Sequence, residues 1–200
     1  MMQIEKSEVL APLFLLLEHL RITEEVRLDI ANQIEVKRVK SNAVLLMPGM
    51  VCTHAHFVVS GGFVCRYFNE NLDVPKTINF YLDDLHPFMA SVDSYFTQQP
   101  SNCELRAVRA STVLSISKKN LDSLLQSNPV LQSFYNSLVI QALVEENELK
   151  LKIISHSAEQ LYQYLLDELP NVIQKVPSKY IAEFMGISAE WLSKLKRRRR

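Results

Sequence analysis

Cysteine and long apolar runs are both scarce in this chain of 200 residues. The three cysteines, Cys52, Cys65 and Cys103, are an odd and sparse set that provides neither a disulfide framework nor a Cys-x-x-Cys metal site. We therefore expect reduced thiols and a cytoplasmic location. One apolar run, at residues 9–17, lacks a small-residue cleavage site and is too short to cross a bilayer, so no membrane partner is expected.

Excess positive charge is missing from most of the chain and gathers at its end. Basic and acidic residues both number 22, so the formal net charge is zero. From Ser157 onward, eight basic residues stand against five acidic ones, which gives +3, and six of the eight lie in the last seven positions. This asymmetry indicates an end that faces nucleic acid on a neutral-to-acidic body, although a solvated arginine tail gives the same count.

The residue pattern changes along the chain in a way that predicts an α+β protein. Helical patterns cover about residues 7–20, with Pro12 starting or breaking the helix, and 24–32, opened by a cap at Thr23. Short β-rich runs with turn signals at 44–47, 57–59, 63–68, 77–81 and 113–116 predict a small barrel or sandwich. Gly61-Gly62 predicts a tight turn between two of these strands.

Helical patterns return at 118–126 and then over a long run. Residues 130–154 predict a helix of roughly 37 Å, which either packs on its own barrel or pairs with a second copy of the chain. An apolar series in steps of four and three residues is the predicted dimerisation seam: Leu131, Tyr135, Leu138, Ala142 and Leu149. Ser157 with Gln160 predicts a capping box that opens the next helix, which gives domains at 1–129, 130–155 and 156–200.

The segment from Pro177 to Lys196 predicts two short helices joined by a tight turn. Ile181, Phe184 and Met185 give the first helix an apolar stripe, and Gly186 supplies the turn because it has no Cβ. Ser188 stands at an N-cap position, and Trp191, Leu192 and Leu195 give the second helix a buried face. Such a pair is either plain core or a helix-turn-helix, whose second helix enters the DNA major groove.

The order of these elements resembles the Crp/Fnr family of bacterial transcription regulators. The most specific segments are I-A-E-F-M-G-I-S-A-E-W-L-S-K-L at 181–195, S-G-G-F-V-C-R-Y at 60–67 and the stretch at 114–129. The resemblance implies an N-terminal antiparallel β-roll, jelly-roll-like, that senses an effector and carries flanking helices. It also implies homodimerisation through the long helix and operator DNA as a partner, with RNA polymerase as a further candidate. The chain ends after Arg200 without the β-hairpin wing of many relatives, so the wing is absent, the domain is of a shorter type, or the sequence is cut.

The effector pocket departs from the pattern of family members that bind cyclic AMP. Their Gly-Glu and Arg-Ser pairs align here with Ala90-Ser91 and Ser101-Asn102, so the carboxylate and the arginine for the ribose and phosphate are both missing. Removing one side of a buried charge pair costs about 3–5 kcal/mol, so we expect no useful cyclic AMP binding. No cofactor is assigned, and an unidentified small-molecule effector is expected in a pocket formed by Phe88, Ala90, Ser91, Ser101, Asn102 and Cys103.

The resemblance assigns roles to the exposed positions of the second helix. Ala189, Glu190 and Lys194 take base-facing positions, where Glu190 accepts from a cytosine amine and Lys194 donates to guanine, unless the two form only a surface ion pair. Six further residues are expected at phosphates, which position the helix without reading sequence: Ser178, Lys179, Ser188, Ser193, Lys196 and Arg197.

Other chemistry is weakly supported. Cys52, His54 and His56, with Cys65, are a remote candidate for a metal site. His86 with Asp83-Asp84 has no nucleophile motif beside it, so no enzyme is expected. The prediction is a dimeric DNA-binding regulator; the alternatives are a cyclic-nucleotide-like interaction module without DNA binding, or a metal or redox sensor.

Overall fold

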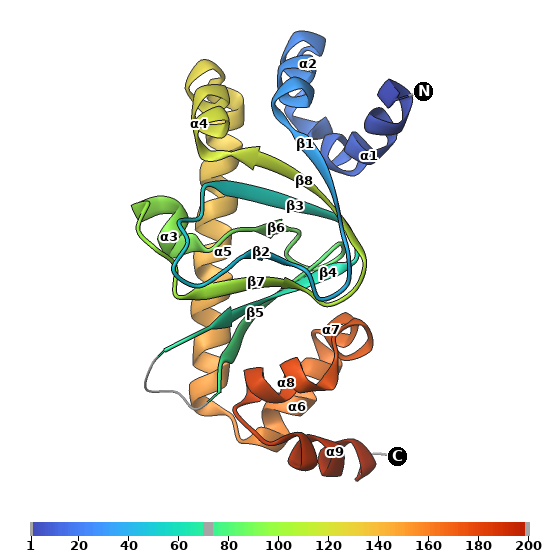
Figure 1. The fold of residues 1–200 in the computed structure, drawn as a ribbon, viewed down its shortest axis with the longest axis vertical. Helices are drawn as coiled ribbons and strands as arrows, with labels where there is room; N and C mark the ends of the chain where they lie inside the picture. Colours follow the sequence, from blue (N-terminus) through green and yellow to red (C-terminus); the bar gives the residue numbers. More distant parts are fainter. Residues whose placement is uncertain (1, 70–73, 199–200) are drawn as a thin grey trace.

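A computed structural model describes residues 2–69 and 74–198 of the chain. Figure 1 shows a β-roll with helices at its N-terminal end, one long helix along its side, and a helical C-terminal domain beneath it. The predicted α+β fold with antiparallel strands is confirmed. Within the described residues, no helix has the length and apolar character that crossing a bilayer requires.

The N-terminal helices cover one outer face of the roll. Helix α1 (Met2–Leu17) passes through Pro12 without a break and continues as the 3-10 turn η1 (Glu18–Leu20). Helix α2 (Glu24–Gln33) follows, and its N-cap Thr23 accepts a hydrogen bond from the Val26 N–H. The expected helix start or break at Pro12 was therefore wrong. Pro12 lies on the exposed side, and the helix is held by Leu10, Leu13 and Leu17, which are buried on the opposite stripe.

Two four-stranded antiparallel sheets make the roll. One has the order β1-β8-β3-β6 and the other β2-β7-β4-β5. The strands are β1 (Glu35–Val39), β2 (Val44–Leu46), β3 (His54–Ser60), β4 (Gly62–Tyr67), β5 (Lys76–Leu82), β6 (Phe88–Met89), β7 (Cys103–Ala107) and β8 (Ser111–Ser117). Between the sheets lies a core that includes Phe63, Leu105 and Val113. Strands β1, β6 and β7 were not among the predicted runs.

The predicted tight turn at Gly61-Gly62 is a corner between sheets and not a hairpin. Strand β3 pairs with β8 and β6, whereas β4 pairs with β5 and β7, so the two strands flanking the turn belong to different sheets. Gly61 has φ +97°, and a Cβ there would lie 2.2 Å from the Ser111 Oγ and 2.7 Å from the Ala110 carbonyl oxygen. The corner therefore requires glycine for both its backbone angle and its closeness to β8.

Helices α3 (Val92–Thr97), α4 (Lys118–Ser127) and α5 (Pro129–Ser155) complete the N-terminal part. Asn128 caps α5 by accepting from the Leu131 N–H, and Pro129 fits the first position because that position needs no intrahelical donor. Helix α5 is 27 residues long, so it spans roughly 40 Å. It runs the height of the roll in Figure 1 and ends at His156, where the chain turns into the C-terminal domain.

Four helices form the C-terminal domain: α6 (Ala158–Asp167), α7 (Pro170–Lys175), α8 (Ser178–Met185) and α9 (Ala189–Arg197). The predicted capping box is present, since Ser157 accepts from the Gln160 N–H while the Gln160 side chain accepts from the Ser157 N–H. The core of this domain is continuous with the outer face of the roll, because Val64, Phe80 and Leu82 pack into it. The C-terminal domain is therefore docked on its own sheet.

Candidate nucleic-acid interface

Helices α8 and α9 are joined by a short turn whose residues are all hydrogen-bonded. Gly186 takes the left-handed conformation (φ +66°), and its N–H donates to the Glu183 carbonyl while the Ile187 N–H donates to the Ala182 carbonyl. Ser188 then caps α9 by accepting from the Trp191 N–H at 3.1 Å. This is a C-cap followed directly by an N-cap, which fixes the direction of the second helix.

Helix α9 has one buried and one exposed face. Leu192 and Leu195 are buried in the helical core, and Trp191 is half-buried against it with the Arg198 guanidinium 5.6 Å from its ring. The opposite face is open to solvent and carries all the predicted base-facing positions, Ala189, Glu190 and Lys194, together with Ser193. The helix therefore presents a polar face of the kind that a recognition helix needs.

Most of the predicted phosphate contacts lie around this face. Ser178, Lys179, Ser188 and Arg197 are exposed, and the Lys196 Nζ is 2.6 Å from the Ser178 Oγ. That contact joins the N-terminus of α8 to the last turn of α9. It brings a cation to the end of a helix whose free N–H groups favour anions.

Glu190 and Lys194 do not form a direct ion pair in the described part of the chain. Backbone N–H donation at Glu190 itself, then the Ser188 hydroxyl, and then the charge of Lys194 lower the pKa of the Glu190 carboxyl. The carboxylate is therefore ionised at neutral pH and available as an acceptor, and the Lys194 ammonium is available as a donor.

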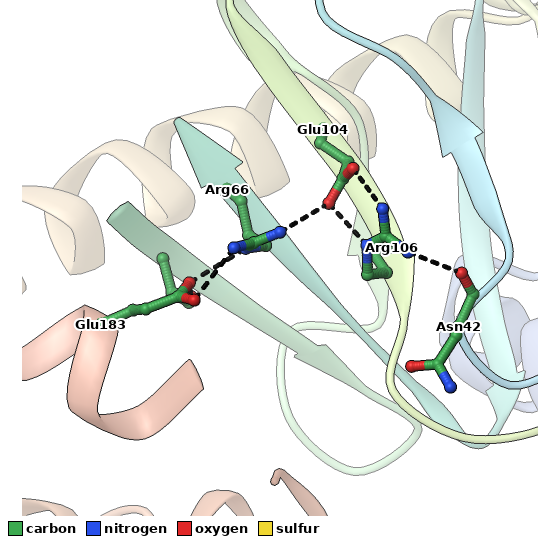
Figure 2. Close-up of polar contacts among 6 residues, drawn as sticks. Asn42, Arg66, Glu104, Arg106 and Glu183 are labelled. Carbon is green, nitrogen blue, oxygen red and sulfur yellow. Dashed lines mark hydrogen bonds and ion pairs between the residues drawn. The ribbon is translucent and has the colours of Figure 1, made fainter. Parts of the chain in front are cut away.

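A chain of ion pairs holds α8 on the roll. The Arg66 guanidinium on β4 donates from Nε and Nη2 to the two Glu183 carboxylate oxygens, both at 2.9 Å, and from Nη1 to Glu104 at 3.2 Å. Glu104 in turn accepts two bonds from Arg106, which also donates to the Asn42 carbonyl (Figure 2). We call Arg66, Glu104, Arg106 and Glu183 the inter-domain network.

The inter-domain network is shielded and strongly charged. Burial would lower the pKa of Arg66 and raise that of Glu104, but the hydrogen bonds and charges of their partners outweigh burial in both cases, which keeps both groups ionised. The side chains of Arg66 and Glu183 are only 15% and 19% exposed, and the Thr77 hydroxyl donates a further 2.9 Å bond to Glu183. Sequence reasoning missed this network because its members are spread over more than 100 positions.

Aromatic and ionic contacts surround the network. Phe80 of β5 and Phe184 of α8 have ring centroids 4.9 Å apart, and the Arg66 guanidinium lies 5.3 Å from the Tyr180 ring. At the other end of the domain, Lys175 of α7 contacts Asp83 at 2.9 Å and Asp84 at 2.5 Å. These aspartates, considered above as a catalytic candidate with His86, thus bind the C-terminal domain.

Three of the predicted effector residues, Ser91, Ser101 and Cys103, form a hydrogen-bonded cluster. Ser91 and Ser101 are buried with their hydroxyl oxygens 2.7 Å apart, and the Cys103 N–H donates to the Ser101 hydroxyl at 2.9 Å. Asn102 contributes its carbonyl to the Phe68 N–H. Phe88 and Ala90 lie apart from this cluster, in the wall of a cavity described below.

The predicted dimerisation residues are divided between two environments. Leu131 is buried in its own N-terminal core, Tyr135 is half-buried against it, and Leu149 packs on the C-terminal core. Leu138 is half-buried and Ala142 exposed. The apolar residues of α5 that are open to solvent form a different stripe, and the most exposed of them are Ile140, Leu143, Val144, Leu151 and Ile154.

Among the described residues, no group of three or more His, Cys, Asp or Glu side chains is arranged to hold a metal ion. The His54 and His56 rings stack 6.3 Å apart, and the Cys52 thiol donates to the His54 carbonyl. Cys65 and Cys103 are buried free thiols; the neighbouring Cys103 thiol raises the pKa of Cys65, and the Cys65 thiol lowers that of Cys103.

Solved structures place this architecture among known folds. A Crp/Fnr-family transcriptional regulator structure from Eubacterium rectale superposes with a TM-score of 0.66 over 88% of this chain and 82% of its own, at 16% sequence identity. The chain has the Crp/Fnr fold. The c-di-GMP-responsive regulator CLP from Xanthomonas campestris superposes with a TM-score of 0.66 at 12% sequence identity, over 88% of this chain and 91% of its own. FixK2 from Bradyrhizobium japonicum superposes with a TM-score of 0.65 at 11% sequence identity, over 82% of this chain and 83% of its own. The sequence itself matches no protein-family model and no curated protein.

Proposed function

We propose that this chain is a sequence-specific DNA-binding transcription regulator that acts as a homodimer. The observation that carries the proposal is the exposed polar face of α9, which projects from a helix whose other side is anchored by Leu192 and Leu195. The Crp/Fnr fold supports it, because the solved structures that share this fold are described as regulators. The basic residues of the last turn add sequence-independent attraction to phosphates.

Roles on α9 follow from exposure and charge. Glu190 and Lys194 are one turn apart on the exposed face, so both can reach base edges in the major groove, as acceptor and donor. Lys196 and Ser178 form a linked pair beside that face and are suited to a backbone phosphate. In this assignment Glu190 and Lys194 read the base sequence, whereas Lys196 and Ser178 position the helix on the DNA backbone.

The homodimer is proposed to form through α5, along a stripe different from the one expected from sequence. Ile140, Val144, Asn147, Leu151 and Ile154 follow steps of four, three, four and three residues, which is the a/d spacing of a two-stranded coiled coil. All five are exposed in the single chain. Asn147, at a d-type position, is the polar residue of this otherwise apolar seam.

Binding to duplex DNA as a function of salt tests the function directly. A library of random duplexes is first enriched for bound sequences, and the enriched duplex and a scrambled one are then titrated by fluorescence anisotropy at several salt concentrations. We expect at least 10³-fold tighter binding to the enriched duplex at physiological salt. Affinity for both should fall steeply as salt increases. An interaction module without DNA binding would yield no enriched sequence and no salt-dependent association.

A further inference from the structure

An apolar cavity lies between the N-terminal helices, the sheet β1-β8-β3-β6 and α5. Its volume is about 270 Å³. Apolar side chains from several elements line it, among them Leu13, Ala55, Phe88, Leu114, Leu121 and Leu138. The polar side chains in its wall are His56, Tyr95 and Tyr135, and no charged residue lines it. A concave, mostly apolar space with a few polar groups is the usual form of a small-molecule site.

Two of those polar side chains are buried without a partner. The His56 Nδ1 and the Tyr95 hydroxyl accept or donate no hydrogen bond among the described residues, although the two residues are only 8% and 3% exposed. Ser115, directly opposite His56 in the β3–β8 register, also has an unpartnered hydroxyl. Each such group costs about 1–3 kcal/mol when nothing satisfies it. A molecule held in the cavity, with a group that bonds to His56 and Tyr95, would remove that cost.

The cavity differs from the effector pocket expected from sequence. Of the six residues of that pocket, only Phe88 and Ala90 line the cavity. The Ser91 and Ser101 hydroxyls instead bond to each other, and the Ser101 hydroxyl also accepts from the Cys103 N–H. The cavity therefore faces the N-terminal helices and α5, outside the hydrogen-bonded serine cluster.

The charge state of the wall selects a neutral ligand. Burial, then the positive charges of Lys37 and His54, lower the pKa of His56 to about 3, so its ring is neutral at physiological pH. Lys118 lies 5.4 Å from the Tyr95 ring, but its ammonium is paired with Asp122 at 2.8 Å. Lys37 is likewise paired, with Glu35 at 3.4 Å. An anionic ligand would therefore enter with both of these cations already neutralised, at a cost that burial makes large.

The volume sets the size of the ligand. An apolar cavity of about 150 Å³ binds benzene, so 270 Å³ corresponds to roughly ten or eleven non-hydrogen atoms. A hydroxyl suits the two polar atoms, because it both donates and accepts and so matches either tautomer of His56. We propose that this cavity binds a neutral, largely apolar molecule of about this size with one hydroxyl, held by His56 and Tyr95.

Isothermal titration calorimetry on the full chain tests the proposal without DNA, so its outcome is independent of the proposed function. The probes are 4-butylphenol, butylbenzene, which lacks the hydroxyl, and 4-propylbenzoate, which carries a charge. We expect saturable binding of one 4-butylphenol per chain, roughly tenfold weaker binding of butylbenzene, and none of 4-propylbenzoate. Tyr95→Phe and His56→Phe should each weaken the binding of 4-butylphenol by about three- to tenfold and leave the affinity for butylbenzene unchanged.

Two further sets of variants locate the site. His156→Phe, which follows α5 and lies outside the cavity, should change no affinity. Ala55→Leu fills the cavity from β3, and Ala142→Phe fills it from the exposed side of α5, where folding is not at risk. Either should abolish binding of both neutral probes. The proposal is overturned by an absence of saturable binding, by equal affinity for 4-propylbenzoate, or by binding that both filling variants leave intact.

Discussion

Glu183 in the first helix of the helix-turn-helix receives a two-bond contact from Arg66 in the β-roll, at 2.9 Å for each bond. The two residues are 117 positions apart and join the two parts of the chain (Figure 2). The contact lies between a continuous apolar core and a further ion pair, Arg66–Glu104. It therefore couples the orientation of α8, and through the α8–α9 turn that of the exposed face of α9, to the sheet β2-β7-β4-β5.

Replacing Glu183 with Gln should loosen the docked domain. We expect the free energy of unfolding to fall by about 2 kcal/mol, less than the roughly 3–5 kcal/mol of a fully buried pair because both side chains keep some exposure. Urea denaturation measures the loss, and amide hydrogen exchange should show faster exchange in α8 and β5. Glu8→Gln, at an exposed position of α1, is the control and should change neither. Equal stability of the two variants would show that the contact does not hold the domain.

Acidification should destabilise the protein through His56. The folded-state pKa of His56 is lowered to about 3 by burial, whereas its ordinary value is 6.5. Between these values the unfolded chain binds a proton that the folded chain does not, so stability is full above about pH 6.5 and is lost as the pH falls toward 3. The contribution of this group is at most about 1.4 kcal/mol per pH unit.

Denaturation at pH 7, 6 and 5 measures that slope. In His56→Phe the slope over this range should be reduced, because the unfolded chain then has one fewer proton to bind. His19→Gln, which removes an exposed imidazole, is the matched control. Identical slopes in the wild type and His56→Phe would contradict the buried, neutral state of this ring.

Much of the fold was predictable from local sequence, because caps and turns act over a few residues. The Ser157–Gln160 capping box and the Gly186 turn both stand where the sequence placed them. Strand β7 was missed although its residues alternate between apolar and polar side chains, as in a half-buried strand. What local sequence does not show is that Glu104 is paired with Arg66, 38 positions away. The pairing of β3 and β4 was mispredicted because Gly61 marks a bend but not which strand lies beside it.

The sequence alone could not show which side of α5 packs against its own chain and which side stays exposed. Two apolar stripes run along α5, and either can be drawn in steps of four and three residues. The packing of the chain decides between them, because Leu131 and Leu149 are taken up by its own cores while Ile140 and Leu151 stay exposed. The cavity could not be predicted from the sequence either, because its wall combines residues from both ends of the N-terminal part.

Introducing charge on the proposed dimer seam should separate the protomers. Leu151→Glu places a carboxylate at an a-type position, where it would face its own copy in a coiled coil. We expect a monomer by sedimentation velocity and at least tenfold weaker binding to the enriched duplex, since one helix then binds without its partner. Leu28→Glu is a matched control, because Leu28 and Leu151 are both 56% exposed. A dimer that survives Leu151→Glu would place the interface elsewhere.

Two lysines on α9 should have different effects on DNA binding. Lys194→Ala removes a proposed base contact. It should therefore reduce the free energy of binding to the enriched duplex by about 1–3 kcal/mol and that to scrambled DNA only slightly. Lys196→Ala removes a proposed phosphate contact, so it should weaken both duplexes alike and reduce the salt slope by about 1. Lys40→Ala, at an exposed position between β1 and β2, controls for a general loss of positive charge. Similar losses on both duplexes for both α9 variants would refute the assigned roles.

Two glycines with positive φ should respond differently to alanine. At Gly186 (φ +66°) a Cβ meets nothing within 4 Å, so Gly186→Ala pays only for the left-handed backbone, about 1–2 kcal/mol. At Gly61 (φ +97°) the same Cβ would collide with Ser111 and the Ala110 carbonyl, so a steric cost is added to the backbone strain. The free energy of unfolding of Gly61→Ala should therefore fall by about 3 kcal/mol or more. Urea denaturation ranks the two variants. If Gly186→Ala proved the more destabilising, the α8–α9 turn would be held by contacts other than those seen here, and the direction of α9 would need a different explanation.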